Sequence, residues 1–500
     1  MDCVIGLDIG TTSTTGILIE PTGGVLSMYS RAVTLSAPRP GWAEEDPHEW
    51  WRNVCAIVPE LLATGGVDAA GVKAVCVTGM LPAVVLLDEH EEVLRASIQQ
   101  SDARCAAQVL ELASEVPQAT FVAQTGNGIN QQLVATKLRW LERHEPAVFA
   151  RIATVFGSYD YINWRLTGVL AVEQNWALEA GFVDLTSGEL DEALIELAHI
   201  SCSAIPPLSR AHQVLGAVTP AAAMATGLAA GTPVTGGAAD HIASAYAAGV
   251  TERGDALLKF GGSADILVAT DTATPDARMF LDYHLIPGLY MPNGCMASGG
   301  SALNWFINTF ATAECATAEQ QGMTAHAYLD LLTAQTPPGA DGVYVLPYFL
   351  GEKTPIHDTR ARGAFLGLSF NHSVSHLWRA LLESFGYAFR HHIEVLNDMG
   401  HPTRRFLASD GGAQSRLWLQ ICADVLGAPV QRLDGHPGSC LGAAWAGAIA
   451  VGISDDWKGV ERFVSAGECF EPAAATRALY EDGYRRYRST YEVLAAIGQL

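Results

Sequence analysis

The sequence has little positive charge. Its 500 residues include 30 Lys and Arg against 53 Asp and Glu, so the formal net charge is −23. No local cluster of basic residues offsets this charge, and an acidic surface repels nucleic acid and anionic membranes. An anionic substrate is also disfavoured unless a metal ion or helix N-termini counter its charge. The composition therefore argues against a nucleic-acid partner and favours a neutral substrate used with a metal-neutralised nucleotide.

Paired cysteines and long apolar runs are also lacking. The ten cysteines are scattered singly from Cys3 to Cys469 without a Cys-x-x-Cys pair. This usage is typical of reduced thiols and argues against a disulfide framework or a zinc site. The N-terminus has no basic region followed by a cleavage site, and apolar stretches such as residues 441–453 are shorter than a membrane span. We therefore expect a cytoplasmic protein with no membrane partner.

Glycine, by contrast, is abundant, and the chain is long. The 49 glycines indicate many tight turns, and 500 residues suit two domains with a cleft between them. Asp46, Pro47 and Glu49 mark the start of a helix, as an N-cap acid, a proline at the first helical position and a glutamate at the third. Strands are expected at residues 3–9, 16–20, from 25 onward, 73–79 and 84–88. Three antiparallel strands, a helix and further strands are the opening of a ribonuclease-H-like α/β layer.

The strand–turn–strand pattern of the N-terminus returns half a chain later. Residues 256–268 again form an apolar segment, a Gly/Ser turn and a second apolar segment. The repeat predicts an α/β protein of two ribonuclease-H-like, actin-like ATPase lobes with an interlobe cleft, in which both turns face one phosphate. A helix end near residues 246–253 places the boundary, giving an N-terminal lobe at 1–248 and a C-terminal lobe at 249–500.

Two glycine turns are candidates for phosphate binding. In the segment from Asp8 to Ser13, Gly10 lets the backbone turn sharply, hydroxyl and amide groups can surround phosphate oxygens, and Asp8 can hold Mg²⁺. The second copy, residues 260–263, could wrap the terminal phosphates from the other lobe. An ordinary hairpin turn is the alternative in each case.

A third glycine segment, residues 410–415, lies between a strand and a helix. Its glycines would let a nucleotide approach the backbone and the helix N-terminus. Alternatively, Asp410 or Ser415 caps the helix and the glycines only form the turn. Residues 438–444 could line the same pocket, but a close-packed helix of small residues is the better single explanation of this segment.

Asp240 is the candidate for the reacting carboxylate. It follows two glycines and two alanines at the start of an Ala-rich helix. Phosphoryl transfer needs an aligned acceptor, neutralised charge and a carboxylate near the attacking hydroxyl. Asp240 could accept that proton, or it could serve only as the N-cap of the helix. Asn caps a helix about as well as Asp but is not a base, so substitution separates the two hypotheses.

Taken together, these motifs resemble the FGGY carbohydrate kinases over nearly the full length, and among them the xylulose-phosphorylating members most. Further matching segments are residues 41–47 with Trp50 and Trp51, 137–141, 351–355 and 363–368. The resemblance implies that the N-terminal lobe binds sugar and the C-terminal lobe binds nucleotide. It also implies ATP and Mg²⁺ as cofactors, Asp240 as catalytic base and Asp8 at the metal. The same resemblance implies that the phosphates are bound by Thr11, Thr12, Ser13, Gly261, Gly262 and Ser263. The nucleoside is expected to be bound by Gly411, Gly412 and Ala413.

The acceptor side departs from the family pattern. Leu81 and Pro82 stand where the xylulose-phosphorylating members carry a polar Met-His-Gly segment, and Gln100 replaces an aromatic residue two positions before Asp102. His241 replaces the usual Asn after the base. The acceptor-binding residues are thus expected to be Leu81, Pro82, Asp102, Asp240 and His241. For His241, simple solvation or packing at the helix start is the alternative.

The sequence therefore predicts an ATP-dependent kinase that transfers the γ-phosphate to a primary hydroxyl of a small sugar or polyol. A pentulose such as xylulose is the expected acceptor, with another ketose, a tetritol or a related polyol as the alternative. An actin-like ATP-driven switch or chaperone is the alternative of a different class. We expect a small-molecule partner and assembly as a homodimer.

Overall fold

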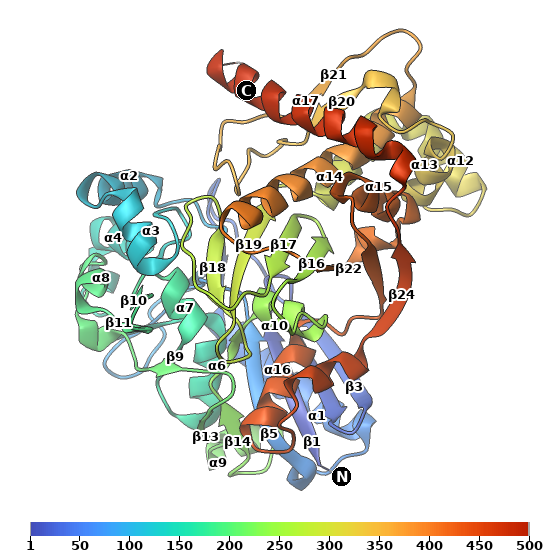
Figure 1. Ribbon diagram of the computed structural model, residues 1–500. Helices are drawn as coiled ribbons and strands as arrows, with labels where there is room; N and C mark the ends of the chain where they lie inside the picture. The colour runs from blue at the N-terminus through green and yellow to red at the C-terminus, as the bar shows by residue number, and fades with distance from the viewer. Residues whose placement is uncertain (1, 499–500) are drawn as a thin grey trace.

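Two seven-stranded sheets, one in each half of the chain, form the frame of the molecule (Figure 1). The computed structural model describes residues 2–498. The first sheet has the order β13-β14-β5-β1-β2-β3, with β15 paired to β5. Its strands are β1 (Cys3–Ile9), β2 (Ser13–Glu20), β3 (Gly24–Ala32), β5 (Val72–Gly79), β13 (Val214–Ala217), β14 (Pro233–Thr235) and β15 (Ala238–Ala239). The predicted N-terminal meander is confirmed.

The second sheet has the order β18-β19-β17-β16-β22-β23-β24. Its strands are β16 (Asp255–Phe260), β17 (Ala264–Val268), β18 (Phe280–Tyr283), β19 (Tyr290–Met296), β22 (Arg405–Ser409), β23 (Val430–Asp434) and β24 (Ser465–Phe470). In both sheets a three-stranded antiparallel meander is followed by two parallel strands, β5 and β14 in the first and β22 and β23 in the second. The duplicated ribonuclease-H-like architecture is therefore confirmed.

Helix α1 (Pro47–Gly65) begins where its sequence signals predict. The side chain of Asp46 accepts a hydrogen bond from the backbone N–H of His48, and Pro47 is the first helical residue. The buried face of the helix, which includes Trp50 and Val54, packs on β2 and β3. One expected strand differs, because β6 (Val85–Leu87) pairs with β8 (Thr154–Phe156) outside the main sheet.

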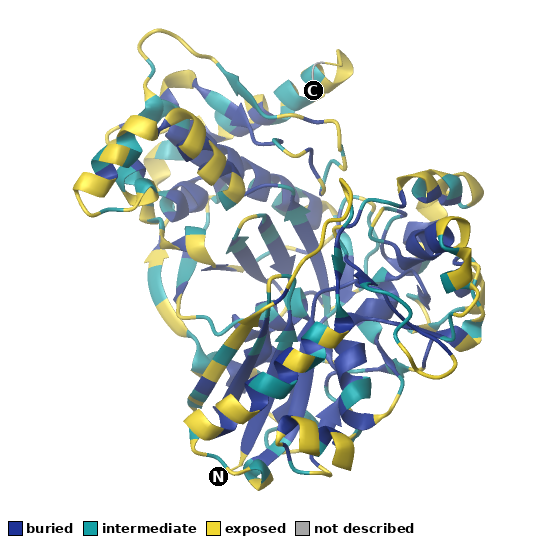
Figure 2. Cartoon of the chain, turned by 180° about the vertical axis from the view of Figure 1, so that it is seen from behind, coloured by how far each residue is buried: buried dark blue, intermediate teal, exposed yellow. Residues whose placement is uncertain are grey.

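Further helices cover the two sheets and build a cap beside the first (Figure 1). The cap contains α2 (Ala106–Glu115), α3 (Gln118–Thr125), α4 (Val134–His144), α7 (Gln174–Glu179) and α8 (Glu192–Glu196). The second sheet is accompanied by α11 (Gly300–Phe310), α12 (Thr312–Gln320), α13 (Ala325–Thr333), α14 (Val374–Asp398), α15 (Arg416–Leu426) and α17 (Arg477–Ala496). Figure 2 shows that the central strands of both sheets are buried, whereas exposed residues lie on the outer helices, on loops and on edge strands such as β3 and β24. Within residues 2–498, no helix combines the length and apolar character that a membrane span requires.

Helix α16 (Ser439–Ala450) returns from the second half of the chain to the first sheet. It packs on β1 and β5 and on α10 (Asp240–Ala247). Glycine permits this approach, because a Cβ on Gly6 would collide with the carbonyl of Cys440, and one on Gly442 with the carbonyl of Ala243. The small-residue helix predicted at 438–444 thus lies at the seam between the halves. The boundary between residues 248 and 249 stays a prediction.

Candidate active site

Two cavities meet at the turn between β16 and β17. Gly261 and Gly262 line one cavity of about 520 Å³. Ser263, the next residue, lines a second cavity of about 500 Å³ together with Asp8, Asp240 and other residues. A group held at this turn therefore has access to both cavities.

The first cavity has the character of a nucleoside site. Gly411 and Gly412 line it from one side, and the rings of Trp378 and Trp418 supply apolar surface. The hydroxyl of Ser415 accepts from the backbone N–H of Trp418 and so caps α15, as the alternative interpretation of this segment expects. The glycines nevertheless face the cavity, so the cap and the binding role are compatible. Ala413 is buried and lies outside the lining.

The first glycine turn lies beside the second cavity. The backbone N–H of Gly10 donates to the carbonyl of Ser13 and closes the hairpin. Thr11 receives a hydrogen bond from Gln100, a residue that lines the second cavity. Thr12 is exposed, and Thr11, Thr12 and Ser13 are not part of either lining. Their contact with phosphate stays a prediction.

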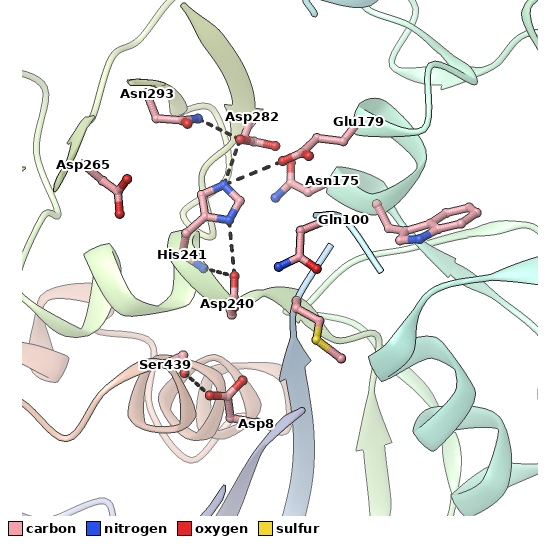
Figure 3. Close-up of polar contacts among 12 residues, drawn as sticks. Asp8, Gln100, Asn175, Glu179, Asp240, His241, Asp265, Asp282, Asn293 and Ser439 are labelled. Atoms are coloured by element: carbon pink, nitrogen blue, oxygen red, sulfur yellow. Dashed lines mark hydrogen bonds and ion pairs between the residues drawn. The ribbon is translucent and has the colours of Figure 1, made fainter. Parts of the chain in front are cut away.

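Asp8 occupies the end of β1 and faces the second cavity (Figure 3). Its Oδ2 accepts a 2.8 Å hydrogen bond from the hydroxyl of Ser439, whereas its Oδ1 is buried and has no hydrogen-bond partner among residues 2–498. Burial first, and then the charge of Asp240, raise the pKa of Asp8. A buried carboxylate with one unpaired oxygen near a second carboxylate fits a hard cation such as Mg²⁺.

Asp240 is the first residue of α10 rather than its N-cap, which is Ala239. Its Oδ1 accepts a 2.6 Å hydrogen bond from the backbone N–H of His241. The carboxylate lines the second cavity, and its side chain is 35% exposed. One oxygen is thus held by the helix start, and the group keeps access to the cavity, which is the arrangement that a base for a bound hydroxyl needs.

His241 also lines the second cavity, in contact with two acids that sequence reasoning missed (Figure 3). Its Nε2 lies 3.0 Å from Oδ2 of Asp282 and 3.9 Å from Oε1 of Glu179. Burial first, and then the charge of Asp282, raise the pKa of Glu179 well above its usual range. Neither Asp282 in β18 nor Glu179 at the end of α7 stands in a motif, so no sequence signal could have found them.

Two of the predicted acceptor residues do not face the cavity. Leu81 lines it, but Pro82 is outside the lining, and its carbonyl accepts from Nζ of the buried Lys137. Asp102 is fully buried, where it pairs with Arg104 at 2.7 Å and accepts from the backbone N–H of Ala43 at 2.6 Å. Internal partners occupy these polar groups of Pro82 and Asp102, and their contact with the acceptor stays a prediction.

Lys259 and Asp265 were also missed, although a signal was present. They interrupt the apolar strands β16 and β17 and stand directly opposite one another in the antiparallel register. Both line the second cavity. Burial opposes the charge of Lys259, but neighbouring carboxylates, Asp265 first among them, raise the pKa of the amine. A charged residue in an otherwise buried strand next to a glycine turn could have indicated a phosphate-side cation.

The duplicated lobes, and a glycine turn between a nucleoside-type cavity and a carboxylate-lined cavity, define a two-lobed phosphotransferase of the actin-like class. The chain belongs to the FGGY family of carbohydrate kinases: the family's N-terminal domain matches residues 3–247 and its C-terminal domain matches residues 256–451. It is therefore a carbohydrate kinase, as the sequence motifs predict.

Related carbohydrate kinases match this chain over nearly its whole length. The chain is 30% identical over 493 residues to the xylulose kinase of Escherichia coli (strain K12), covering 98% of this chain and 99% of that protein. The crystal structure of xylulose kinase from Rhodospirillum rubrum is 56% identical, covers 99% of each chain and superposes with a TM-score of 0.94. The gluconokinase of Bacillus subtilis (strain 168) is 25% identical over 500 residues, and the match covers 99% of this chain and 96% of that protein. Relatives thus share the fold and differ in acceptor.

Proposed function

We propose that this carbohydrate kinase transfers the γ-phosphate of ATP to a primary hydroxyl of a small neutral sugar or polyol, with a pentulose such as xylulose as acceptor. The observation that carries the proposal is the 261–263 turn, whose residues line a nucleoside-type cavity on one side and the cavity of Asp240 on the other. The relatives from Escherichia coli and Rhodospirillum rubrum, both described as xylulose kinases, support the acceptor class.

The donor side of the reaction uses the glycine turns together with Asp8 and Lys259. Gly261, Gly262 and Ser263 would hold the terminal phosphates, and Gly411 and Gly412 the nucleoside. Asp8 would hold Mg²⁺, which neutralises phosphate charge when bound. Lys259 brings a fixed positive charge to the same cavity, so the charge that develops on the transferred group has a cation beside it.

On the acceptor side, Asp240 acts as the general base. Its free carboxylate oxygen accepts the proton of the primary hydroxyl while the hydroxyl oxygen forms its bond to the γ-phosphorus. The bond from that phosphorus to the β–γ bridging oxygen breaks, and ADP leaves with the electron pair. Because water competes as an acceptor, exclusion of water from the cavity between the lobes favours transfer to sugar.

The second cavity suits a neutral acceptor. Leu81, Gln100 and Gln132 line it with apolar and amide groups, and Glu179 adds a carboxyl group. A carboxylate sugar would meet the carboxylate of Asp240 in a partly dehydrated space, where like charges repel strongly. A polyhydroxy acceptor can instead exchange hydrogen bonds with the amides and carboxyls, and the loss of one such partner changes discrimination by orders of magnitude.

The test is a panel of ketoses, tetritols and other polyols, assayed with Mg-ATP for ADP release. Xylulose and ribulose represent pentuloses, and gluconate serves as the acidic comparator. We expect a neutral pentulose to raise ADP release far above the rate without sugar. An ATP-driven switch would show no such rise, so a panel without any stimulating sugar would refute the proposal. The homodimer and the cytoplasmic location stay predictions. Light scattering of the purified protein tests the assembly state.

A further inference from the structure

Strand β18, the edge of the second sheet, is held by two asparagine side chains from the first half of the chain. The amide of Asn127 donates to the carbonyl of Leu281 at 2.9 Å and accepts from its N–H at 3.0 Å. The amide of Asn175 does the same with Tyr283, at 2.9 and 2.7 Å. Backbone groups of alternate residues face the same side of a strand. The two amides therefore replace a neighbouring strand and fix the position of β18 against the cap.

Asp282 lies between these two docked residues and is fully buried. Its Oδ2 accepts a 2.8 Å hydrogen bond from the amide of Asn293 and lies 3.0 Å from Nε2 of His241. Its Oδ1 is buried and has no hydrogen-bond partner in the part of the chain that the structure describes. Docking of β18 thus brings a carboxylate of the second half to an imidazole of the first, and Figure 3 shows this contact.

The other side of the imidazole faces Asp240. His241 Nδ1 lies 3.4 Å from Oδ1 of Asp240, the oxygen that also accepts the backbone N–H of His241. Both ring nitrogens therefore face carboxylate oxygens, and only the doubly protonated ring can donate to both. Burial by itself lowers the pKa of His241, but Asp282, Asp240 and Glu179 raise it well above its usual value. These acids come from β18, α10 and α7, the elements that surround the ring.

We propose that His241 is a positioning residue, whose ring links Asp240 to Asp282 so that docking of β18 by Asn127 and Asn175 orients the base. The inference rests on the proposed function, because it takes Asp240 as the base. The link ties up Oδ1 of Asp240 and leaves Oδ2 for the acceptor hydroxyl. Base geometry then depends on the relation between the two halves of the chain, so the base is aligned only when the halves are docked.

The test compares His241→Asn and Asp282→Asn with His90→Asn, a matched control at a highly exposed histidine. Asn at 241 cannot bridge two carboxylates, and Asn at 282 keeps the shape but not the charge. For each variant, kcat and KM for the best acceptor and for ATP are measured from about pH 6 to 10. We expect kcat to fall about 10- to 100-fold in both site variants, since small errors in base position are costly, while KM for ATP stays within about twofold.

The pH profile separates positioning from packing. Because the pKa of His241 is raised, the wild-type ring should lose its second proton only at alkaline pH, and kcat should fall there. The kcat of His241→Asn should show no such alkaline fall. Unchanged kcat in both site variants, or a lower kcat with the wild-type alkaline limb intact in His241→Asn, would overturn the proposal.

A second variant tests the docking without touching the cavity. Asn127 is buried and outside the cavity lining, and Asn127→Ala removes one of the two amide pairs on β18. We expect a lower kcat with acceptor KM nearly unchanged, and thermal melting shows whether the variant folds. Failure of the proposed function has a different signature, because the wild type would then show no sugar-stimulated ADP release. An active wild type, an inactive Asp240→Asn and a normal His241→Asn would refute only the positioning role.

Discussion

The hydroxyl of Ser439 donates a 2.8 Å hydrogen bond to Oδ2 of Asp8, a residue 431 positions earlier in the chain. The contact joins the first residue of α16 to the end of β1, where the two halves of the chain meet. It supplies one of the two carboxylate oxygens with a partner and leaves the other for a cation. The predicted metal residue therefore depends on a side chain from the second half.

Replacing Ser439 by Ala removes this hydrogen bond. A hydrogen bond to a charged group contributes about 1.5–3 kcal/mol, so we expect the Mg²⁺ concentration for half-maximal ADP release to rise about tenfold or more. The measurement is a Mg²⁺ titration at saturating ATP and sugar. Ser489→Ala, at an exposed serine of α17, is the control and should leave the titration unchanged. An unaltered Mg²⁺ requirement in Ser439→Ala would contradict the assignment of Asp8 to the metal.

Replacing Asp240 by Asn should preserve the fold and remove nearly all turnover. The amide retains an oxygen for the backbone N–H of His241 but cannot take the proton of the acceptor. General base catalysis contributes about 10²- to 10⁴-fold, and we expect a loss in that range. Sugar-dependent ADP release measures it, with thermal melting and ADP binding as controls. A folded variant with a near-normal rate would remove Asp240 from the mechanism.

Gly262→Ala tests the phosphate turn without disturbing the protein. Apart from Gly262 and its two neighbours in the chain, no atom of residues 2–498 lies within 4 Å of a Cβ placed on Gly262, so the methyl group would project into open space beside the first cavity. We expect KM for ATP to rise about tenfold with an unchanged melting temperature, because only a bound phosphate would meet the methyl group. Normal ATP kinetics would exclude close contact with the nucleotide.

Gly412→Ala is the contrasting case at the other glycine segment. A Cβ there would lie 2.6 Å from the ring of Trp418 and 2.9 Å from the carbonyl of Phe260. We expect the melting temperature to fall, since overpacking against backbone costs about 1–3 kcal/mol. Gly24→Ala is the control, because its Cβ would find its nearest atom at 3.8 Å. A stable Gly412→Ala would show that this turn can relax.

The buried Glu45 predicts a dependence of stability on pH. Burial raises the pKa of Glu45 to about 8, even though Trp50 donates a 2.8 Å hydrogen bond to it. As pH rises through the unfolded value, the unfolded chain releases the proton while the folded chain keeps it, so the contribution of Glu45 to stability falls between about pH 5 and pH 8.

Glu45→Gln removes this dependence, because the amide is neutral throughout and still accepts from Trp50. We expect the variant to melt about 2 to 5 °C above the wild type at about pH 8 and close to it at about pH 5. Thermal melting at both pH values is the measurement, and Glu319→Gln, at an exposed acid, is the control. Equal melting temperatures at the higher pH would show that Glu45 is ionised in the folded protein.

Local patterns predicted much of the fold. The cap at Asp46, the proline after it and the repeated strand–turn–strand segments depend on neighbours within a few residues, and each appears where it was expected. The glycine turns and Asp240 were found for the same reason, since a turn beside a strand end is visible in a short window. The internal pairing of Asp102 with Arg104 could not be predicted in this way, because it depends on how the surrounding segments pack.

The sequence by itself determined the two-lobed class and the positions of the glycine turns and of the candidate base, because their signals are short-range periodicity and turn chemistry. Only the tertiary structure decided which side chains meet Asp8 and His241. Asp282 and Glu179 stand in no motif, and Ser439 belongs to the 438–444 segment, whose contact with Asp8 no motif predicted. These side chains reach the site through β18, α7 and α16. The physical reason is that a contact between segments far apart in the chain depends on how helices and sheets pack, which no local window of residues records.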